Sequence, residues 1–174
     1  LCGLADSTFG NNGKTYFQLD AYNYLNHIRL QPDGKILGSG LISGGGAMSS
    51  FTPFFCRLNS NGSLDSSFRG TGYFADRFDP ISGGEYFDSH IYPDGKILAI
   101  GKSYQNVNGG VLGIGLTRFL PDGTLDTSFN SNGRKVLPVY SFGPSTGFVL
   151  PGSRSIFIAA QIESGNTTFP RIAK

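Results

Sequence analysis

The feature that most constrains the fold is a short stretch, built around a turn, that recurs along the chain. It reads YPDGKILAIG at Tyr92–Gly101 and QPDGKILGSG at Gln31–Gly40, and it returns in altered form as LPGSRSIFIAA at Leu150–Ala160. The Asp-Gly pair supplies the positive φ that a tight hairpin turn needs. The sequence therefore predicts three units, each centred on two strands that meet at this turn.

A second stretch recurs with the same period. It reads LADSTFGNNG at Leu4–Gly13, LDSSFRGTG at Leu64–Gly72 and LDTSFNSNG at Leu125–Gly133. The copies lie about 60 residues apart, and such a period indicates an array of supersecondary units. We expect one repeat domain over residues 1–174, with units at about 1–58, 59–120 and 121–174.

Each unit is predicted to contain four antiparallel strands and almost no helix. The 26 Gly and 9 Pro suit many short strands joined by tight turns, and no segment has helical periodicity. In the first unit the expected strands are Lys14–Leu19, His27–Gln31, Lys35–Ile42 and Phe51–Leu58. In the second they are Gly72–Phe78, Phe87–Tyr92, Lys96–Tyr104 and Leu112–Leu120, and in the third Arg134–Val139, Thr146–Leu150, Ser155–Glu163 and Thr167–Ala173. The predicted fold class is all-β.

The strand before each Pro-Asp-Gly turn alternates between two kinds of residue. In the first unit Ile28 and Leu30 share one face, while the other face carries His27, Arg29 and Gln31. The second unit places Asp88, His90 and Tyr92 on that other face. A face that changes between copies is where a repeat scaffold can carry function, but exposure to solvent is the simpler explanation.

An arginine recurs near the end of the last strand of each unit, as Arg57, Arg118 and Arg171. Asp65 and Asp126 follow the first two, so we expect each of these arginines to pair with the aspartate after it. Arg suits such a pair because its guanidinium matches a carboxylate at two points. The expected role is structural.

The three motifs, taken together, resemble the delta-60 repeat of bacterial surface and secreted proteins. That pattern is roughly LDxSFGxxG, QxDGKIxxxG and RLNxDGxLD, carried here by Leu64–Gly72, by Gln31–Gly40 with Tyr92–Gly101, and by Arg57–Asp65 with Arg118–Asp126. In the third copy Gly152-Ser153-Arg154 replaces Asp-Gly-Lys, and the last motif stops after Arg171. The resemblance implies one β-propeller blade per repeat and no catalytic residues.

Three blades are too few for a closed propeller, which typically has 4–8. Arg171 has no aspartate after it and Asp6 has no arginine before it, so we expect Arg171 of one chain to approach Asp6 of another. This predicts a dimer or trimer, or further repeats in a parent chain. A β-trefoil or β-prism, which would close within one chain, stays open as the alternative fold.

Charge and composition exclude several classes of function. The formal net charge is +2 with Lys and Arg dispersed, so no basic stripe indicates nucleic-acid binding. No apolar run approaches the 18 residues of a membrane span. His27 and His90 are the two histidines, and no third ligand lies at zinc spacing, so neither a metal nor another cofactor is expected. Asp88 and His90 lie on one strand face and could orient an imidazole, but no nucleophile motif accompanies them.

The leading hypothesis is a non-enzymatic binding module of a secreted or cell-surface protein, which contacts carbohydrate or protein. The candidate ligand-binding residues are Tyr22, Tyr24, Tyr86, Asp88, His90 and Tyr104, with Tyr140 as a further exposed aromatic. A purely structural repeat of a larger surface protein or fibre is the second hypothesis. A hydrolase or lyase is the third, against which the lack of a repeated carboxylate pair counts.

Two cysteines, Cys2 and Cys56, allow one disulfide, which would tie the N-terminus to the first unit in an oxidising compartment. The alternative is two unrelated thiols, with Cys56 a small buried apolar residue.

Overall fold

The computed structural model describes residues 3–20, 22–44, 51–78, 82–105, 111–138, 146–149, 155–164 and 167–173. Within these ranges the side chains of 105, 111–112, 146–149 and 160–173 are not described. The described residues form strands and turns, which confirms the all-β prediction. No helix among them is long and apolar enough to cross a membrane.

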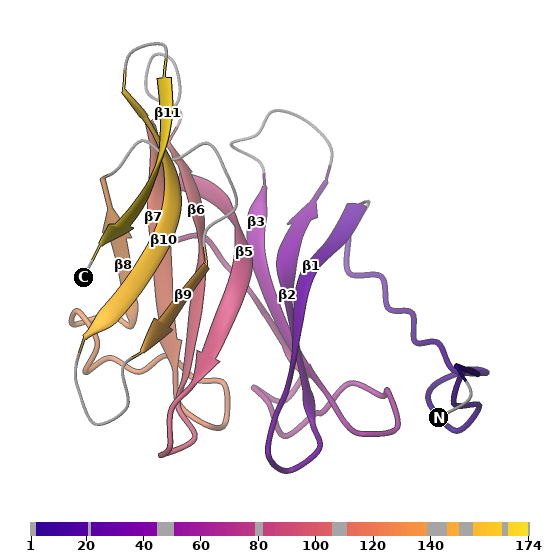
Figure 1. Cartoon of the computed structure of the whole chain (residues 1–174). Coiled ribbons are helices and arrows are strands. Elements are labelled where there is room, and N and C mark those ends of the chain that lie inside the picture. Colours follow the sequence, from indigo (N-terminus) through magenta and orange to yellow (C-terminus); the bar gives the residue numbers. More distant parts are fainter. Residues whose placement is uncertain are drawn as a thin grey trace.

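Within the described residues, eleven strands form three antiparallel sheets (Figure 1). The first sheet has the order β1 (Tyr22–Leu30), β2 (Ile36–Ser43), β3 (Thr52–Leu58) and β4 (Tyr73–Ala75). The second has the order β5 (Ser82–Ile91), β6 (Ile97–Gln105), β7 (Val111–Phe119) and β8 (Arg134–Leu137). A three-stranded sheet has the order β11 (Thr167–Ala173), β10 (Ile156–Ser164) and β9 (Thr146–Val149).

The Pro-Asp-Gly turns lie where the sequence predicts them, between β1 and β2 and between β5 and β6. Gly34 and Gly95 adopt φ of 83° and 81°, a region that costs glycine little. The Gln31 N–H donates to the Lys35 carbonyl at 2.8 Å, and the Tyr92 N–H donates to the Lys96 carbonyl at the same distance. The repeated Pro-Asp-Gly sequence therefore forms the same hydrogen-bonded turn twice.

The sheets are offset by one strand from the sequence units. Residues Tyr73–Ala75, expected to open the second unit, pair as β4 with Phe54–Cys56 of β3 and so complete the first sheet. In the same way β8 completes the second sheet by pairing with β7. The strand expected at Lys14–Leu19 is not formed, and no described strand pairs with this segment.

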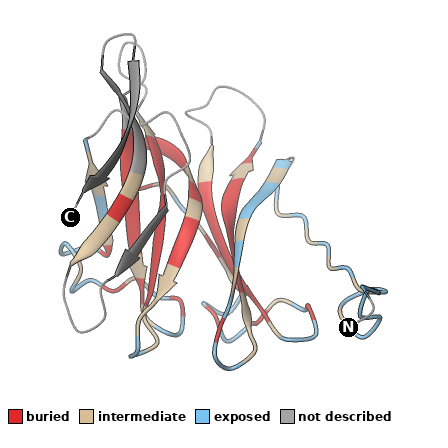
Figure 2. Ribbon diagram, in the orientation of Figure 1, coloured by how far each residue is buried: buried red, intermediate tan, exposed pale blue. Residues whose placement is uncertain are grey.

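The three sheets stack face to face, with the second between the other two (Figure 1). The core between the first and second sheets is largely aromatic; its buried members include Phe55, Phe68, Phe74, Tyr86 and Phe119. The core between the second and third sheets is aliphatic, with Leu98, Ile100, Ile114, Leu116 and Ile158. Figure 2 shows that burial concentrates in the strands of the first and second sheets that face each other, whereas β1 is mostly exposed or half-buried.

The polar face of β1 is less exposed than its apolar face, whereas the simpler expectation from the sequence is that the polar face is the exposed one. Ile28 and Leu30, the apolar face, are 63% and 69% exposed. His27 and Arg29 are half-buried and Gln31 is buried, on the side of the second sheet. The changing polar face is therefore not explained by exposure to solvent, because its residues are at least half-buried beside the second sheet, where His27 and Arg29 contact Asp88.

A contact between neighbouring turns also recurs. The Gly10 N–H donates to the Asn61 carbonyl and the Arg69 N–H donates to the Asp122 carbonyl, both at 2.8 Å. The phenylalanine before each donor packs on the next turn, so a Cβ on Gly123 would lie 2.5 Å from the Phe68 ring. The segment around Phe9 thus holds the first sheet in the way the segment around Phe68 holds the second.

Candidate functional site

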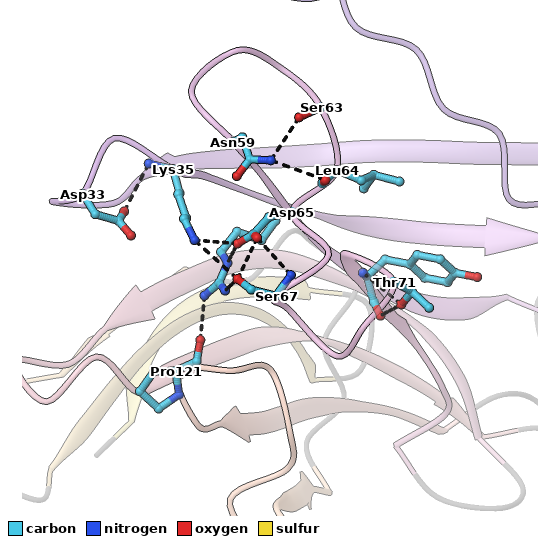
Figure 3. A network of polar contacts seen from close by, with 11 residues as sticks. Asp33, Lys35, Asn59, Ser63, Leu64, Asp65, Ser67, Thr71 and Pro121 are labelled. Carbon is cyan, nitrogen blue, oxygen red and sulfur yellow. Dashed lines mark hydrogen bonds and ion pairs between the residues drawn. The ribbon is translucent and has the colours of Figure 1, made fainter.

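A polar cluster centred on Asp65 joins the first sheet to the second (Figure 3). Arg57 Nε donates to Asp65 Oδ2 at 2.6 Å, and Lys35 Nζ donates to the same oxygen at 2.8 Å. Arg57 Nη1 also donates at 2.6 Å to the carbonyl of Pro121, in the turn that follows β7 of the second sheet. Burial acts to raise the pKa of Asp65, but hydrogen bonds from Lys35, Ser67 and Arg57 outweigh it and hold that pKa well below its ordinary value.

The second copy of this cluster repeats the contacts among arginine, aspartate and serine. Arg118 Nε donates to Asp126 Oδ2 at 2.8 Å, and Ser128 donates to the other carboxylate oxygen. Both predicted Arg–Asp pairs are therefore confirmed. Asp6 is exposed and accepts hydrogen bonds from Thr8, whereas the side chain of Arg171 lies outside the described residues. The pairs recur in both copies, and each ties the end of a strand to the turn that follows it.

A pocket of about 400 Å³ opens between the first two sheets at the start of β1, and we call it the tyrosine pocket. Its lining includes Tyr22, Tyr24, Asn26, Ser43, Phe51 and Glu85. Tyr22 and Tyr24 are two residues apart on β1, so their rings lie on one face of the strand, and they are 55% and 54% exposed. Aromatic surface is therefore available to a ligand on one side of the pocket.

Glu85, on β5, supplies the charged group of the tyrosine pocket. Its Oε2 accepts a hydrogen bond from Asn26 Nδ2 at 3.0 Å, and its Oε1 accepts one from the Tyr104 hydroxyl. Burial and the Glu85 carboxylate together raise the pKa of Tyr104, so its hydroxyl stays protonated and donates. These contacts hold the carboxylate in one orientation, with lone pairs left for a ligand that donates.

A β-bulge places Asn26 in this pocket. The register of β1 against β2 shifts between Leu25 and His27, and the β5 register shifts at the equivalent point between Tyr86 and Asp88. Asn26 also donates to the Tyr86 carbonyl at 3.1 Å, which ties the bulge to the second sheet. Bulges re-aim side chains next to binding sites, but nothing in the sequence marks this one.

The six residues chosen from the sequence fall into three groups. Tyr22 and Tyr24 line the tyrosine pocket, and Tyr104 lies behind it against Glu85. Tyr86 is fully buried and donates to Thr117 Oγ1 at 2.8 Å, so it belongs to the core and not to a ligand site. The site residues Asn26, Phe51 and Glu85 were missed, because only the packing of β5 against β1 brings them together.

Asp88 and His90 lie outside the tyrosine pocket. Asp88 accepts a hydrogen bond from Arg29 at 2.9 Å and lies 3.4 Å from His27 Nε2, so it joins β5 to β1. The His90 ring meets the Tyr92 ring edge to face at 5.3 Å between centroids. Burial first and then Arg29 lower the pKa of His90, while Asp88 opposes them.

Of the two alternatives for Cys56, the structure shows the free thiol and not a disulfide. Cys56 is a free thiol with no exposed surface, and burial raises its pKa to about 12. Cys2 lies outside the described residues, as does Tyr140.

The chain is similar to a known protein family over part of its length. A family model described as a β-propeller domain of unknown function, DUF5122, matches residues 31–68 and 93–129. Each matched stretch covers the Pro-Asp-Gly turn, the next two strands and the Arg–Asp pair, so the match is consistent with a propeller-type repeat. No curated protein matches the chain.

Proposed function

We propose that the chain is a non-enzymatic binding module that holds a carbohydrate in the tyrosine pocket. The observation that carries the proposal is the pairing of two half-exposed aromatic rings, Tyr22 and Tyr24, with one oriented carboxylate, Glu85. Small-ligand sites combine apolar and aromatic walls with a few placed polar groups. A sugar ring matches this arrangement, since its C–H face can pack on a tyrosine while its hydroxyls donate to Glu85.

Binding is a better reading than hydrolysis for this pocket. Glycosidases use two carboxylic groups, separated by about 5–9.5 Å, as acid with base or nucleophile. The lining of the tyrosine pocket, within the described residues, includes the single carboxylate Glu85. Both its oxygens already accept hydrogen bonds, which suits a group that positions a ligand.

The architecture we propose for this module is a set of three delta-60-type repeats, each forming a blade of a propeller. The propeller family match over two repeats and the third sheet formed by β9–β11 support it. The resemblance to delta-60 repeats is also the support for a secreted or cell-surface location.

A second candidate function, assembly into a larger structure, rests on the outer face of the first sheet. Leu25, Ile28 and Leu30 are 49%, 63% and 69% exposed there, whereas the equivalent Tyr86 and Ser89 of the second sheet are 0% and 1% exposed beneath the first sheet. A face of this kind is suited to another sheet of the same type. We propose that this sheet comes from a second copy of the chain, in a dimer or trimer, or from further repeats.

Binding of purified protein to an array of immobilised glycans tests the leading proposal. Tyr24→Ala is expected to weaken binding at least tenfold, about 1.4 kcal/mol, because it removes one aromatic wall. Tyr16→Ala is the matched control: Tyr16 is 81% exposed and does not line the pocket, so binding should be unchanged. Absence of glycan binding by the wild type, together with self-association that Ile28→Lys abolishes, would replace the binding proposal with the assembly one.

A further inference from the structure

A groove lies between the Pro-Asp-Gly turns of the first two sheets, at the opposite end of β1 from the tyrosine pocket. Its volume is about 550 Å³, and its lining includes Arg29, Gln31, Arg57, His90, Tyr92 and Pro121. We call it the turn groove. It shares no lining residue with the tyrosine pocket.

Two buried polar atoms of this lining have no hydrogen-bond partner among the described residues. They are the Oε1 of Gln31, an acceptor, and the Nε of Arg29, a donor. Gln31 is only 9% exposed, and its backbone is fixed by the closed turn that its N–H makes with Lys35. Since buried polar groups are nearly always paired, an unpaired acceptor and donor in one groove indicate a ligand that supplies their partners.

The two arginines that line the groove are already paired. Arg29 Nη2 lies 2.9 Å from Asp88 Oδ1, and Arg57 Nε lies 2.6 Å from Asp65 Oδ2. An anionic ligand would therefore meet compensated arginines beside the carboxylate of Asp33, and it would lose its own hydration without gaining a partner. A neutral group that both accepts and donates fits better, and a hydroxyl does both.

The two residues that carry these unpaired atoms, Arg29 and Gln31, are not repeated in the second unit. Arg57 recurs as Arg118 in the second unit, whereas the positions of Arg29 and Gln31 are taken there by His90 and Tyr92. The structural pairs are thus kept while the groove residues change. The Tyr92 ring, which is half-buried in the same lining, offers apolar surface to the C–H side of a ligand.

We propose that the turn groove binds a neutral sugar or polyol through adjacent hydroxyls. One hydroxyl accepts from Arg29 Nε, and one donates to Gln31 Oε1. The site is separate from the tyrosine pocket and does not rest on the function proposed for that pocket.

Titration of the full chain with glucose, galactose, mannose and myo-inositol, followed by amide NMR shifts, tests this site. At least one probe should shift the signals of Gln31 and Tyr92. Gln31→Met, which keeps the length of the side chain and removes its acceptor, should weaken that binding about tenfold. It should not lower the melting temperature, because an unpaired buried acceptor is lost. Gln18→Met, at an exposed glutamine, is the matched control and should change neither quantity.

Three results would overturn the proposal. One is that no probe shifts groove signals at any concentration tested. Another is that Gln31→Met binds as the wild type does while Tyr24→Ala does not, which would place all sugar binding in the tyrosine pocket. The third is that acetate or phosphate displaces the sugar and binds more tightly, which would make the groove an anion site.

Discussion

Asp65→Asn is expected to lower the free energy of unfolding by about 3 kcal/mol. The side chains of Asp65 and Arg57 are only 7% and 8% exposed, and removal of one charge from a buried pair typically costs 3–5 kcal/mol. We take the low end because Lys35, the third member, is 29% exposed and water can reach it. Asparagine nearly preserves the shape of the site, so the loss reports on charge and hydrogen bonding.

The amide of Asn cannot satisfy the groups around this position in either orientation. Oδ2 of Asp65 faces the donors Arg57 Nε and Lys35 Nζ, while Oδ1 accepts from the Ser67 N–H at 3.1 Å. Whichever oxygen becomes NH₂, a donor then faces a donor. For a chain of this size, a loss of 3 kcal/mol corresponds to about 6–12 °C in melting temperature.

Asp126→Asn is the matched comparison, and it should cost about 1–2 kcal/mol. Arg118 is 20% exposed and Lys96 Nζ lies 3.4 Å from Asp126, so the residual charges there are better solvated and less tightly held. Urea unfolding followed by tyrosine fluorescence measures both changes. If Asp126→Asn costs as much as Asp65→Asn, or if Asp65→Asn costs less than about 1 kcal/mol, burial does not control these pairs as argued.

Two further outcomes follow from titratable groups. Hydrogen bonds lower the pKa of Asp65 and Asp126 from the ordinary 3.8 in the folded state, so their contribution is complete above that pH and is lost as pH falls below it. Urea titrations should give a constant unfolding free energy from pH 7 to about 5 and a decline below pH 4, shallower in Asp65→Asn; a decline that begins above pH 5 would contradict this. Burial raises the pKa of Cys56 to about 12, so in a Cys2→Ser background a thiol reagent at pH 8 should leave the native protein unmodified and react once urea is added. Fast labelling of the native protein would show that Cys56 is accessible.

The local features of this fold could be predicted from the sequence because their causes lie within a few residues. The Pro-Asp-Gly turns depend on Gly34 and Gly95 at positive φ, and the hairpins formed around both. The Arg57–Asp65 pair could be predicted because the same spacing recurs between Arg118 and Asp126. An arginine side chain near the end of a strand is long enough to contact the turn that follows. These predictions needed no knowledge of which sheets meet.

Features that depend on contacts between sheets could not be predicted in the same way. The sequence predicts β4 as the first strand of the second unit, whereas β4 pairs with β3 in the first sheet. The residues of β4 alone do not indicate whether the partner strand precedes or follows them in the chain. Glu85 has no motif, and it becomes part of a pocket only when β5 packs beside β1 and Asn26 leaves the regular ladder. The aromatic ring of Tyr86 makes it a candidate from the sequence, but only the packing of β5 shows that this ring is buried and that its hydroxyl donates to Thr117.

The late position of β4 in the chain has a consequence for synthesis on the ribosome. Strand β3 is made first, and its edge stays open until Tyr73–Ala75 have also left the exit tunnel. Translation proceeds at about 5–20 residues per second, so synthesis of the segment between Leu58 and Tyr73 keeps that edge unpaired for roughly a second in every nascent chain. An open edge can recruit strands of neighbouring chains. Pro53 lacks an N–H and lies just outside the three residues that β4 later covers, so it shortens the edge open to misassociation while translation continues.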